Sequence, residues 1–269
     1  PEQELNQGVV HLKVIETRIG TVTVEGNRYF DEANIRKSLP ALREGETPNI
    51  PKVSANLKMA NENPAKKVRL QLQSGDNDDV INASLKIDDG SPWKFNTNVD
   101  NTGNASTGNT RVGMVLQQAN IVGLDHALSL QYTTTLEKPS KVSIYGVGYH
   151  IPLYEKNASI DLIGSYSNVD SGSVSAGAVN LQVSGKGATY GVRYNHNFER
   201  SGDYDSKLMV GLDYKAYKNN VELLGQQLGN DVTVHPLSLN YAGTLTSPEG
   251  EAGFYVGWLR NVPGGDHGT

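Results

Sequence analysis

Most of the chain after residue 92 repeats one short pattern of alternating apolar and polar positions. In residues 207–216, every second side chain from Leu208 to Ala216 is apolar or aromatic, and the positions between them include Asp213 and Lys215. Because successive side chains of a β-strand point to opposite faces, this pattern predicts a strand with one apolar and one polar face. Nine such segments begin near Trp93, Arg111, Ala127, Val142, Ala158, Ala188, Lys207, Val232 and Gly253.

The lengths of the segments and of their connections favour a membrane barrel over a soluble sandwich. Strands of soluble sheets usually have about five or six residues, whereas these run to about ten, as strands that cross a membrane do. Short and mostly long connections alternate along the chain, as is typical of outer-membrane barrels. The short ones lie near residues 122–125, 154–157, 200–205 and 248–251, and the longer ones near residues 101–109, 170–186 and 219–231.

The N-terminal part predicts a different architecture. A strand near residues 19–24 is followed by a helix that Asp31 caps and by a second helix that Asn49 caps. Two further strands are expected at residues 67–73 and 80–87. This order predicts a small α+β domain over residues 19–88, with both helices on one face of a three-stranded sheet. Residues 89–92 would link it to the barrel region, residues 93–269.

Composition narrows the chemistry. The 269 residues carry a net charge of −5 and lack the basic stripe that nucleic-acid binding normally requires. Cysteine is absent, which excludes disulfides and thiolate metal sites, and neither a zinc-protease His pair nor a Walker phosphate loop occurs. We therefore expect no catalytic site, no metal or other cofactor, and neither a nucleic-acid nor a nucleotide partner.

Three stretches resemble one known family. The small domain resembles a POTRA (polypeptide-transport-associated) domain through Ile19, Val22, Val24, Gly26, Asn27, the helix at 31–39 and Gly45. The barrel entry resembles the first hairpin of two-partner secretion transporters, the hemolysin secretion/activation proteins of the FhaC/ShlB type. Its motifs are Val99-Asp100-Asn101-x-Gly103-x-x-Ser106-Thr107-Gly108, then Asn120-x-x-Gly123-x-Asp125, and later Tyr149-x-Ile151-Pro152-Leu153.

The resemblance implies an outer-membrane translocator whose POTRA domain lies in the periplasm and which exports one large haemolysin or adhesin. The barrel of such a protein has about sixteen strands, of which residues 93–269 would supply about nine. Residues 1–18, with Gly8, Leu12, Val14 and Glu16, resemble the closing strand of a preceding POTRA domain. The resemblance then implies that the chain is a fragment. The family's signature arginine, which lies on a loop inside the pore, would follow Thr269.

The same resemblance implies where partners bind. The partner's N-terminal secretion domain would add as an extended strand to the edge at residues 67–73, beside the helix at 31–39. The candidate contacts are Ile35, Leu39, Lys67, Arg69 and Gln71. The barrel would contact outer-membrane lipid, with an interfacial girdle formed by Trp93, Tyr132, Tyr149, Tyr166, Tyr194 and Trp258.

The polar face of the strands supplies the remaining candidates. Side chains at the polar positions of each strand should face the interior of the barrel and line the pore. The charged residues at such positions are Arg111, Arg193, Asp213 and Lys215. Two other functions stay open at this point. One is a membrane insertase of the related barrel-assembly type, and the other is a passive porin-like barrel.

Overall fold

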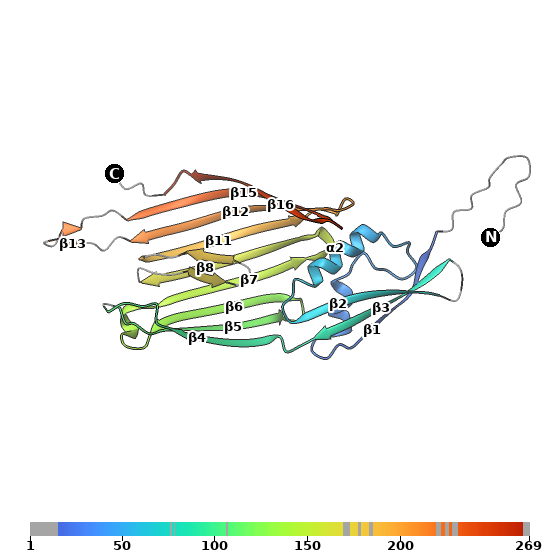
Figure 1. Cartoon of the computed structure of the whole chain (residues 1–269), viewed down its shortest axis with the longest axis horizontal. Helices are drawn as coiled ribbons and strands as arrows, with labels where there is room; N and C mark the ends of the chain where they lie inside the picture. The colour runs from blue at the N-terminus through green and yellow to red at the C-terminus, as the bar shows by residue number, and fades with distance from the viewer. Residues whose placement is uncertain are drawn as a thin grey trace, which may run out of the picture.

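The computed structural model has a small domain at one end of a large curved sheet (Figure 1). It describes residues 16–75, 77, 79–105, 107–168, 173–176, 179–182, 185–218, 222–223, 226–227 and 231–265. The expected remnant of a preceding domain falls mostly in residues 1–15 and therefore lies outside the described residues, as does part of each of the expected long connections at 170–186 and 219–231.

The small domain has the order of elements that the sequence predicts. Its elements are β1 (Arg18–Glu25), α1 (Glu32–Lys37), α2 (Ile50–Ala60), β2 (Lys66–Ser74) and β3 (Val80–Asp89). The sheet order is β1-β3-β2, with β1 parallel and β2 antiparallel to β3. The middle strand is thus the last in sequence, which leaves β1 and β2 as the two edges.

Local side-chain chemistry explains where the two helices begin. The side chain of Asp31 accepts a hydrogen bond from Asn34 N at 2.7 Å, and that of Asn49 accepts one from Lys52 N at 3.0 Å. Both satisfy donors that the first helical turn leaves unpaired. Phe30 is buried between the helices and the apolar face of the sheet, which Val24, Leu70 and Leu85 form in register. The predicted α+β arrangement is confirmed.

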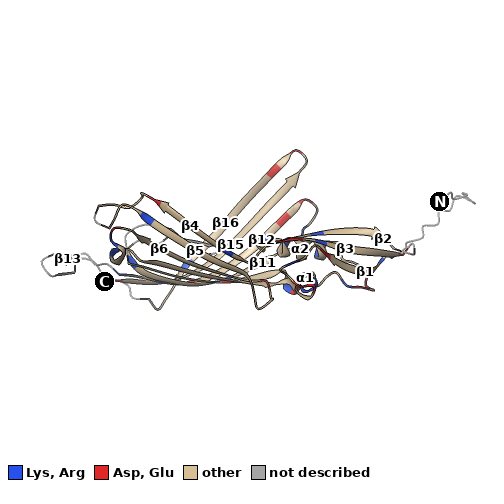
Figure 2. Cartoon of the chain, turned by 90° about the horizontal axis from the view of Figure 1, so that it is seen from below, with Lys and Arg blue, Asp and Glu red and all other residues tan. Residues whose placement is uncertain are grey.

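The large sheet contains the nine predicted strands, all antiparallel, in the order β16-β15-β12-β11-β8-β7-β6-β5-β4. Their bounds are β4 (Trp93–Asp100), β5 (Arg111–Ile121), β6 (His126–Thr135), β7 (Ile144–Leu153), β8 (Ala158–Asn168), β11 (Lys186–Asn197), β12 (Tyr204–Lys218), β15 (Val232–Ser247) and β16 (Gly250–Val262). Each begins within a few residues of its predicted start. Figure 2 shows the sheet bent into a trough, with β4 rising on one side and β15 and β16 on the other.

Several short elements complete the fold. Two 3₁₀ turns, η1 (Pro139–Lys141) and η2 (Tyr154–Lys156), connect neighbouring strands of the large sheet. The short strands β9 (Ser173–Ala176) and β10 (Val179–Gln182) pair with each other, and β9 contacts β6, β7 and β8. A second short pair is formed by β13 (Glu222–Leu223) and β14 (Gln226–Gln227).

Exposure on the large sheet is the reverse of that in a water-soluble protein. On β12 the apolar Leu212 is 46 % exposed, whereas its neighbour Asp213 is only 7 % exposed. The same holds on β8 and β11, where Tyr166 and Tyr190 are exposed and Ser165 is buried. An apolar outer face and a polar inner face are what a strand between lipid and water requires. No helix within the described ranges is long and apolar enough to cross a membrane.

One predicted boundary is wrong. Asp89, which we expect to open a linker at residues 89–92, is the last residue of β3. Its carboxylate accepts hydrogen bonds from the backbone N–H groups of Arg28, Tyr29 and Phe30, at 2.8–3.1 Å. These three donors lie in the connection between β1 and α1, so Asp89 is fixed by the fold of the small domain and is not part of a flexible joint.

The short turns of the large sheet lie at the end that carries the small domain, because residues 120–125, 154–157 and 205 all contact it. The opposite end, with η1, should therefore face the cell exterior. We predict that Ser140→Cys in the full-length protein reacts with a membrane-impermeant thiol reagent on intact cells. Ser201→Cys, in the β11–β12 turn, should react only after permeabilisation; labelling in the opposite sense would reverse the topology.

Candidate functional site: the joint between the small domain and the barrel

A buried ion pair joins the small domain to the large sheet. Lys66, the first residue of β2, is only 2 % exposed, and its ammonium group donates to a carboxylate oxygen of Asp125 in the β5–β6 turn. Asp125 is likewise 2 % exposed. Lys66 also donates to Asn34 Oδ1 at 3.0 Å, and its ammonium group lies 5.0 Å from the centre of the Phe30 ring. Two opposite charges removed from water need such additional partners if their burial is to be tolerated.

The turn that presents Asp125 has an unusual backbone. Val122 and Asp125 have positive φ angles of 49° and 61°, and Gly123 has φ 71°. A positive φ is a genuine outlier for a β-branched residue such as Val122 and persists only where surrounding contacts enforce it. The side chain of Asn120 supplies one such contact, because its Oδ1 accepts from Asp125 N at 3.0 Å. The motif Asn120-x-x-Gly123-x-Asp125 thus builds the barrel side of the joint.

Asparagine side chains of the small domain bond to the backbone of the barrel turns. Asn34 donates to Gly123 O at 2.8 Å, and Asn63 donates to Ala119 O at 2.8 Å. Asn56 donates to Tyr154 O at 3.0 Å. Each bond joins a side chain of the small domain to a backbone carbonyl of the large sheet, and a hydrogen bond of this kind contributes about 0.5–1.5 kcal/mol. The two parts are therefore held in one defined orientation.

Tyr154 of η2 closes the joint from the other side. Its hydroxyl donates to Asp125 Oδ2 at 2.7 Å. Burial, together with the neighbouring Asp125 carboxylate, raises the pKa of Tyr154, so the hydroxyl stays a donor. Burial lowers the pKa of Lys66, and the carboxylate of Asp125 opposes that shift. At the rim of the joint, Lys58 of α2 pairs with Asp205 at the start of β12.

The two edges of the small sheet are occupied differently. Beside β1, Ile19 exchanges backbone hydrogen bonds with Gly45 and Glu46 at 2.7 and 3.0 Å, which covers that edge. Beside β2, the side chain of Asn61 bonds to both the N–H and the C=O of Val68, at 2.7 and 3.0 Å. The backbone groups of Val68 therefore point away from β3.

In an antiparallel strand, alternate residues turn their backbone groups to the same side. The N–H and C=O groups of Leu70 and Leu72 must accordingly point outward, as those of Val68 do. Leu72 is 44 % exposed. Beyond Val68, β2 therefore presents an open edge in the described structure, and an unpaired edge of this kind is a template for another strand.

The structure separates the predicted partner-binding residues. Ile35 and Leu39 are 0 % and 1 % exposed and lie in the core of the small domain, so their proposed contact with a partner is wrong for this conformation. Of the two helices, α2 has the more extensive contact with β2, whereas α1 reaches only its first residue, through the bond between Asn34 and Lys66. Lys67, Arg69 and Gln71 are exposed on the face of the sheet that the helices leave open. Their role in binding remains a prediction.

Three of the predicted pore-lining residues come together on the inner face of the large sheet. Arg193 donates to Asp213 Oδ2 at 2.8 Å, and Lys215 Nζ lies 3.7 Å from the same atom. Arg111 stands apart from them at the far end of β5, directly opposite Asp100 of β4. Whether these residues line a conducting pore remains a prediction.

A second polar group on the inner face is not apparent from the sequence. Asp161 lies 2.6 Å from His150 Nδ1 and accepts from Asn195 Nδ2 at 2.6 Å. The sequence also gives no sign of the joint around Lys66, because an adjacent pair of lysines normally predicts two solvated side chains. Groups of His, Asp and Glu that could hold a metal ion do not occur in the described part of the chain.

Together these features define the class of protein. It combines a small POTRA-like α/β domain with an antiparallel sheet that matches part of an outer-membrane barrel. The family model of the haemolysin secretion/activation proteins ShlB/FhaC/HecB matches residues 81–251, which is more than half of the chain. The chain therefore belongs to this family, a family of outer-membrane secretion proteins rather than enzymes.

Individual relatives agree with this assignment. The outer membrane transporter CdiB of Dickeya dadantii (strain 3937) is 27 % identical over 123 residues, which is 46 % of this chain and 21 % of that protein. The outer membrane transporter CdiB of Escherichia coli is 22 % identical over 243 residues, 89 % of this chain and 40 % of that protein. The chain thus spans less than half the length of these relatives.

Solved structures show the same fold. The structure of CdiB from Escherichia coli superposes with a TM-score of 0.76 at 21 % identity, covering 98 % of this chain and 48 % of that one. The structure of CdiB from Acinetobacter baumannii gives a TM-score of 0.66 at 15 % identity, covering 97 % of this chain and 48 % of that one.

Proposed function

We propose that the full-length protein is a two-partner secretion transporter that exports one large haemolysin- or adhesin-type protein across the outer membrane. The observation that carries this proposal is the open edge of β2, whose first residue, Lys66, is anchored at the barrel by Asp125. A partner strand added to this edge would be held at the periplasmic mouth of the barrel.

Strand addition suits an unfolded cargo. Backbone hydrogen bonds supply the affinity with few demands on sequence, and the outward groups of Leu70 and Leu72 offer them. The exposed side chains of Lys67, Arg69 and Gln71 would add weak contacts to the cargo, because charges at solvent-exposed positions contribute little.

A partly polar cavity at the joint would receive the cargo on its way from the edge into the barrel. A cavity of about 480 Å³ lies between the α2–β2 connection and the inner face of the large sheet. Glu62, Asn63 and Pro64 line it from the small domain, and Gln117, Ser129, Asp161 and Lys207 line it from the barrel. Such a mixture of donors and acceptors can exchange hydrogen bonds with a passing peptide backbone. We infer that cargo released from β2 enters the barrel here, and that folding of the cargo outside the cell drives export.

Proline at the open edge should weaken cargo capture. Proline has no N–H and cannot complete a ladder, so Leu72→Pro removes one outward donor while leaving the bonds to β3 in place. We expect export to fall about tenfold, since each ladder bond contributes about 0.5–1.5 kcal/mol and the proline ring also obstructs its neighbour.

Two control variants make this result interpretable. Leu72→Ala keeps the donor and should export cargo nearly normally. Arg69→Pro removes a donor that bonds to β3 and should unfold the small domain, which circular dichroism would detect. A folded Leu72→Pro variant with normal export would refute strand addition on β2.

Deletion of the gene tests the proposed function against the other two candidates. Loss of a secretion transporter should remove one large protein from the cell surface and medium, as measured by quantitative proteomics, and wild-type protein should restore it. Loss of an insertase would instead deplete many outer-membrane proteins. Loss of a porin would change the uptake of small solutes and leave both sets of proteins intact.

A further inference from the structure

The outer face of β11 and β12 changes from apolar to cationic toward the end of the sheet that lies opposite the small domain, called the loop end below. Going along the paired strands, Tyr190 faces Tyr214, Ala188 faces Ala216, and Lys186 faces Lys218. All six residues lie on the same face of the sheet as Leu212, because side chains alternate between the two faces and each of the six is an even number of positions from Leu212 or from its partner Val192. Their side chains therefore lie on the exposed apolar face. The two lysines are themselves exposed and lie just beyond the aromatic band, at the end of the barrel opposite the small domain.

Two lysines in this relation are unfavourable by themselves. Directly opposite side chains of an antiparallel pair have Cβ atoms about 4.5–5.5 Å apart, and like charges there repel each other. On the other side of Lys186 the partner is Asn168, which is uncharged. Asp231 directly precedes β15, and the register that pairs Tyr217 with Val232 brings it next to Lys218. Among these described residues of the rim, two lysines therefore accompany one aspartate, and a bound anion would relieve the repulsion between the lysines.

An apolar groove runs across the same face. It has a volume of about 480 Å³, and its lining includes Phe95, Leu116, Leu130, Val147 and Tyr190. Gly164 forms part of its floor, where a Cβ atom would lie 2.9 Å from Val147 Cγ1 and 3.5 Å from the Tyr190 ring. A side chain at this position would therefore press against Val147 and Tyr190 and make the groove shallower there.

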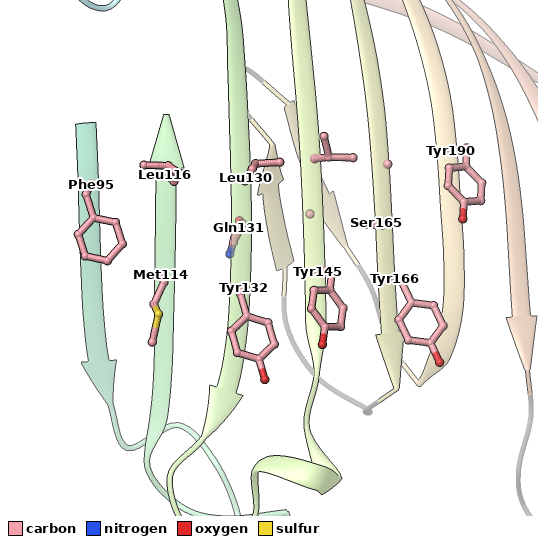
Figure 3. A pocket seen from close by; sticks show the side chains of 13 residues that line it. Phe95, Met114, Leu116, Leu130, Gln131, Tyr132, Tyr145, Ser165, Tyr166 and Tyr190 are labelled. Atoms are coloured by element: carbon pink, nitrogen blue, oxygen red, sulfur yellow. The ribbon is translucent and has the colours of Figure 1, made fainter. Parts of the chain in front are cut away.

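Tyrosine hydroxyls border the groove on the loop side. Figure 3 shows the rings of Tyr132, Tyr145 and Tyr166 in a row on neighbouring strands, with their hydroxyl groups directed toward the loop end. Amphipathic rings in this position belong at the boundary between acyl chains and head groups. Lys186 lies four residues from Tyr190 along β11, which corresponds to about 13 Å, and the small Ala188 between them leaves the surface open.

We propose that this surface binds a phosphorylated glycolipid of the outer leaflet, lipopolysaccharide. One phosphate would lie between the ammonium groups of Lys186 and Lys218, and the acyl chains would lie along Ala188 and Ala216 and in the groove over Gly164. Three features favour lipopolysaccharide as the ligand. They are the two lysines at the outer rim, the row of tyrosine hydroxyl groups between the lysines and the apolar face, and a groove that crosses from β4 to β11.

The test compares two charge-matched double variants of the purified full-length protein in detergent. Lys186→Gln with Lys218→Gln removes the paired cations, and Lys52→Gln with Lys156→Gln removes two exposed lysines at the periplasmic end. Each lysine near an anionic lipid surface strengthens binding roughly fivefold. The first variant should therefore bind fluorescent lipopolysaccharide about 25-fold more weakly than wild type, and the second should bind like wild type.

Two further measurements make the result specific. Lipopolysaccharide stripped of its lipid A phosphates should bind wild type as weakly as the intact lipid binds the Lys186/Lys218 variant. In the absence of lipid, that variant should unfold at the same or a higher temperature than wild type, because the repulsion is gone. Equal weakening in both double variants, or undiminished binding of the dephosphorylated lipid, would overturn the proposal.

Discussion

Replacement of Lys66 by alanine should destabilise the joint between the small domain and the barrel by about 3–5 kcal/mol, because it leaves the buried carboxylate of Asp125 without its cation. The small domain should then sample many orientations. Spin labels at Lys52 and Ser140 of the full-length protein would report this as a broad distance distribution in place of a narrow one. Lys67→Ala, which changes the neighbouring exposed lysine, should leave the distribution narrow.

A double substitution separates the ion pair from simple loss of volume. Lys66→Met combined with Asp125→Asn removes both charges, and the asparagine keeps a side-chain acceptor for the Tyr154 hydroxyl and tolerates the positive φ of position 125. The distance distribution should then return most of the way to that of wild type. If Lys66→Ala alone leaves the distribution narrow, the asparagine bonds hold the joint and the ion pair does not.

Replacement of Leu212 by arginine should lower the free energy of unfolding of the barrel in lipid vesicles by about 2–4 kcal/mol. Leu212 lies near the middle of β12 on the exposed apolar face, so an arginine there would have to enter the hydrocarbon core. Met209→Arg, three residues earlier on the inner face, places the same side chain in the aqueous interior and should cost little. Equal losses for the two variants would mean that the assignment of faces is wrong.

Asp213 would be an unsuitable control for this experiment. Its carboxylate pairs with Arg193 and lies close to Lys215, so an arginine at position 213 would bring three cations together on the inner face. The effect would then reflect repulsion between charges rather than transfer from water to lipid.

The strands of the barrel could be predicted from sequence because one physical constraint dominates them. Lipid on one face and water on the other impose a period of two residues on every strand, and Leu212 and Asp213 express that period directly. The helix starts at Asp31 and Asn49 could also be predicted, because a capping side chain acts on a donor only three residues away.

The joint could not be predicted, because its partners are distant in sequence. Lys66 and Asp125 are 59 residues apart, and Asn56 and Tyr154 are 98 apart. The apolar positions Ile35 and Leu39 mark one face of a helix, yet the pattern does not say whether a partner or the domain's own sheet covers that face. The outward direction of Leu70 and Leu72 follows only from the bonds between Asn61 and Val68.

The most direct test of the central claim is site-specific photocross-linking during export. A photoreactive phenylalanine analogue would replace Leu72 at the open edge, Gln117 on the inner face of the barrel, or Thr23 on the opposite strand of the small domain. If the cargo pairs with β2 and then enters the barrel, the first two positions should cross-link to the same large exported protein, and Thr23 should not. Cross-links from Thr23 alone, or none from Leu72 while export continues, would contradict the account.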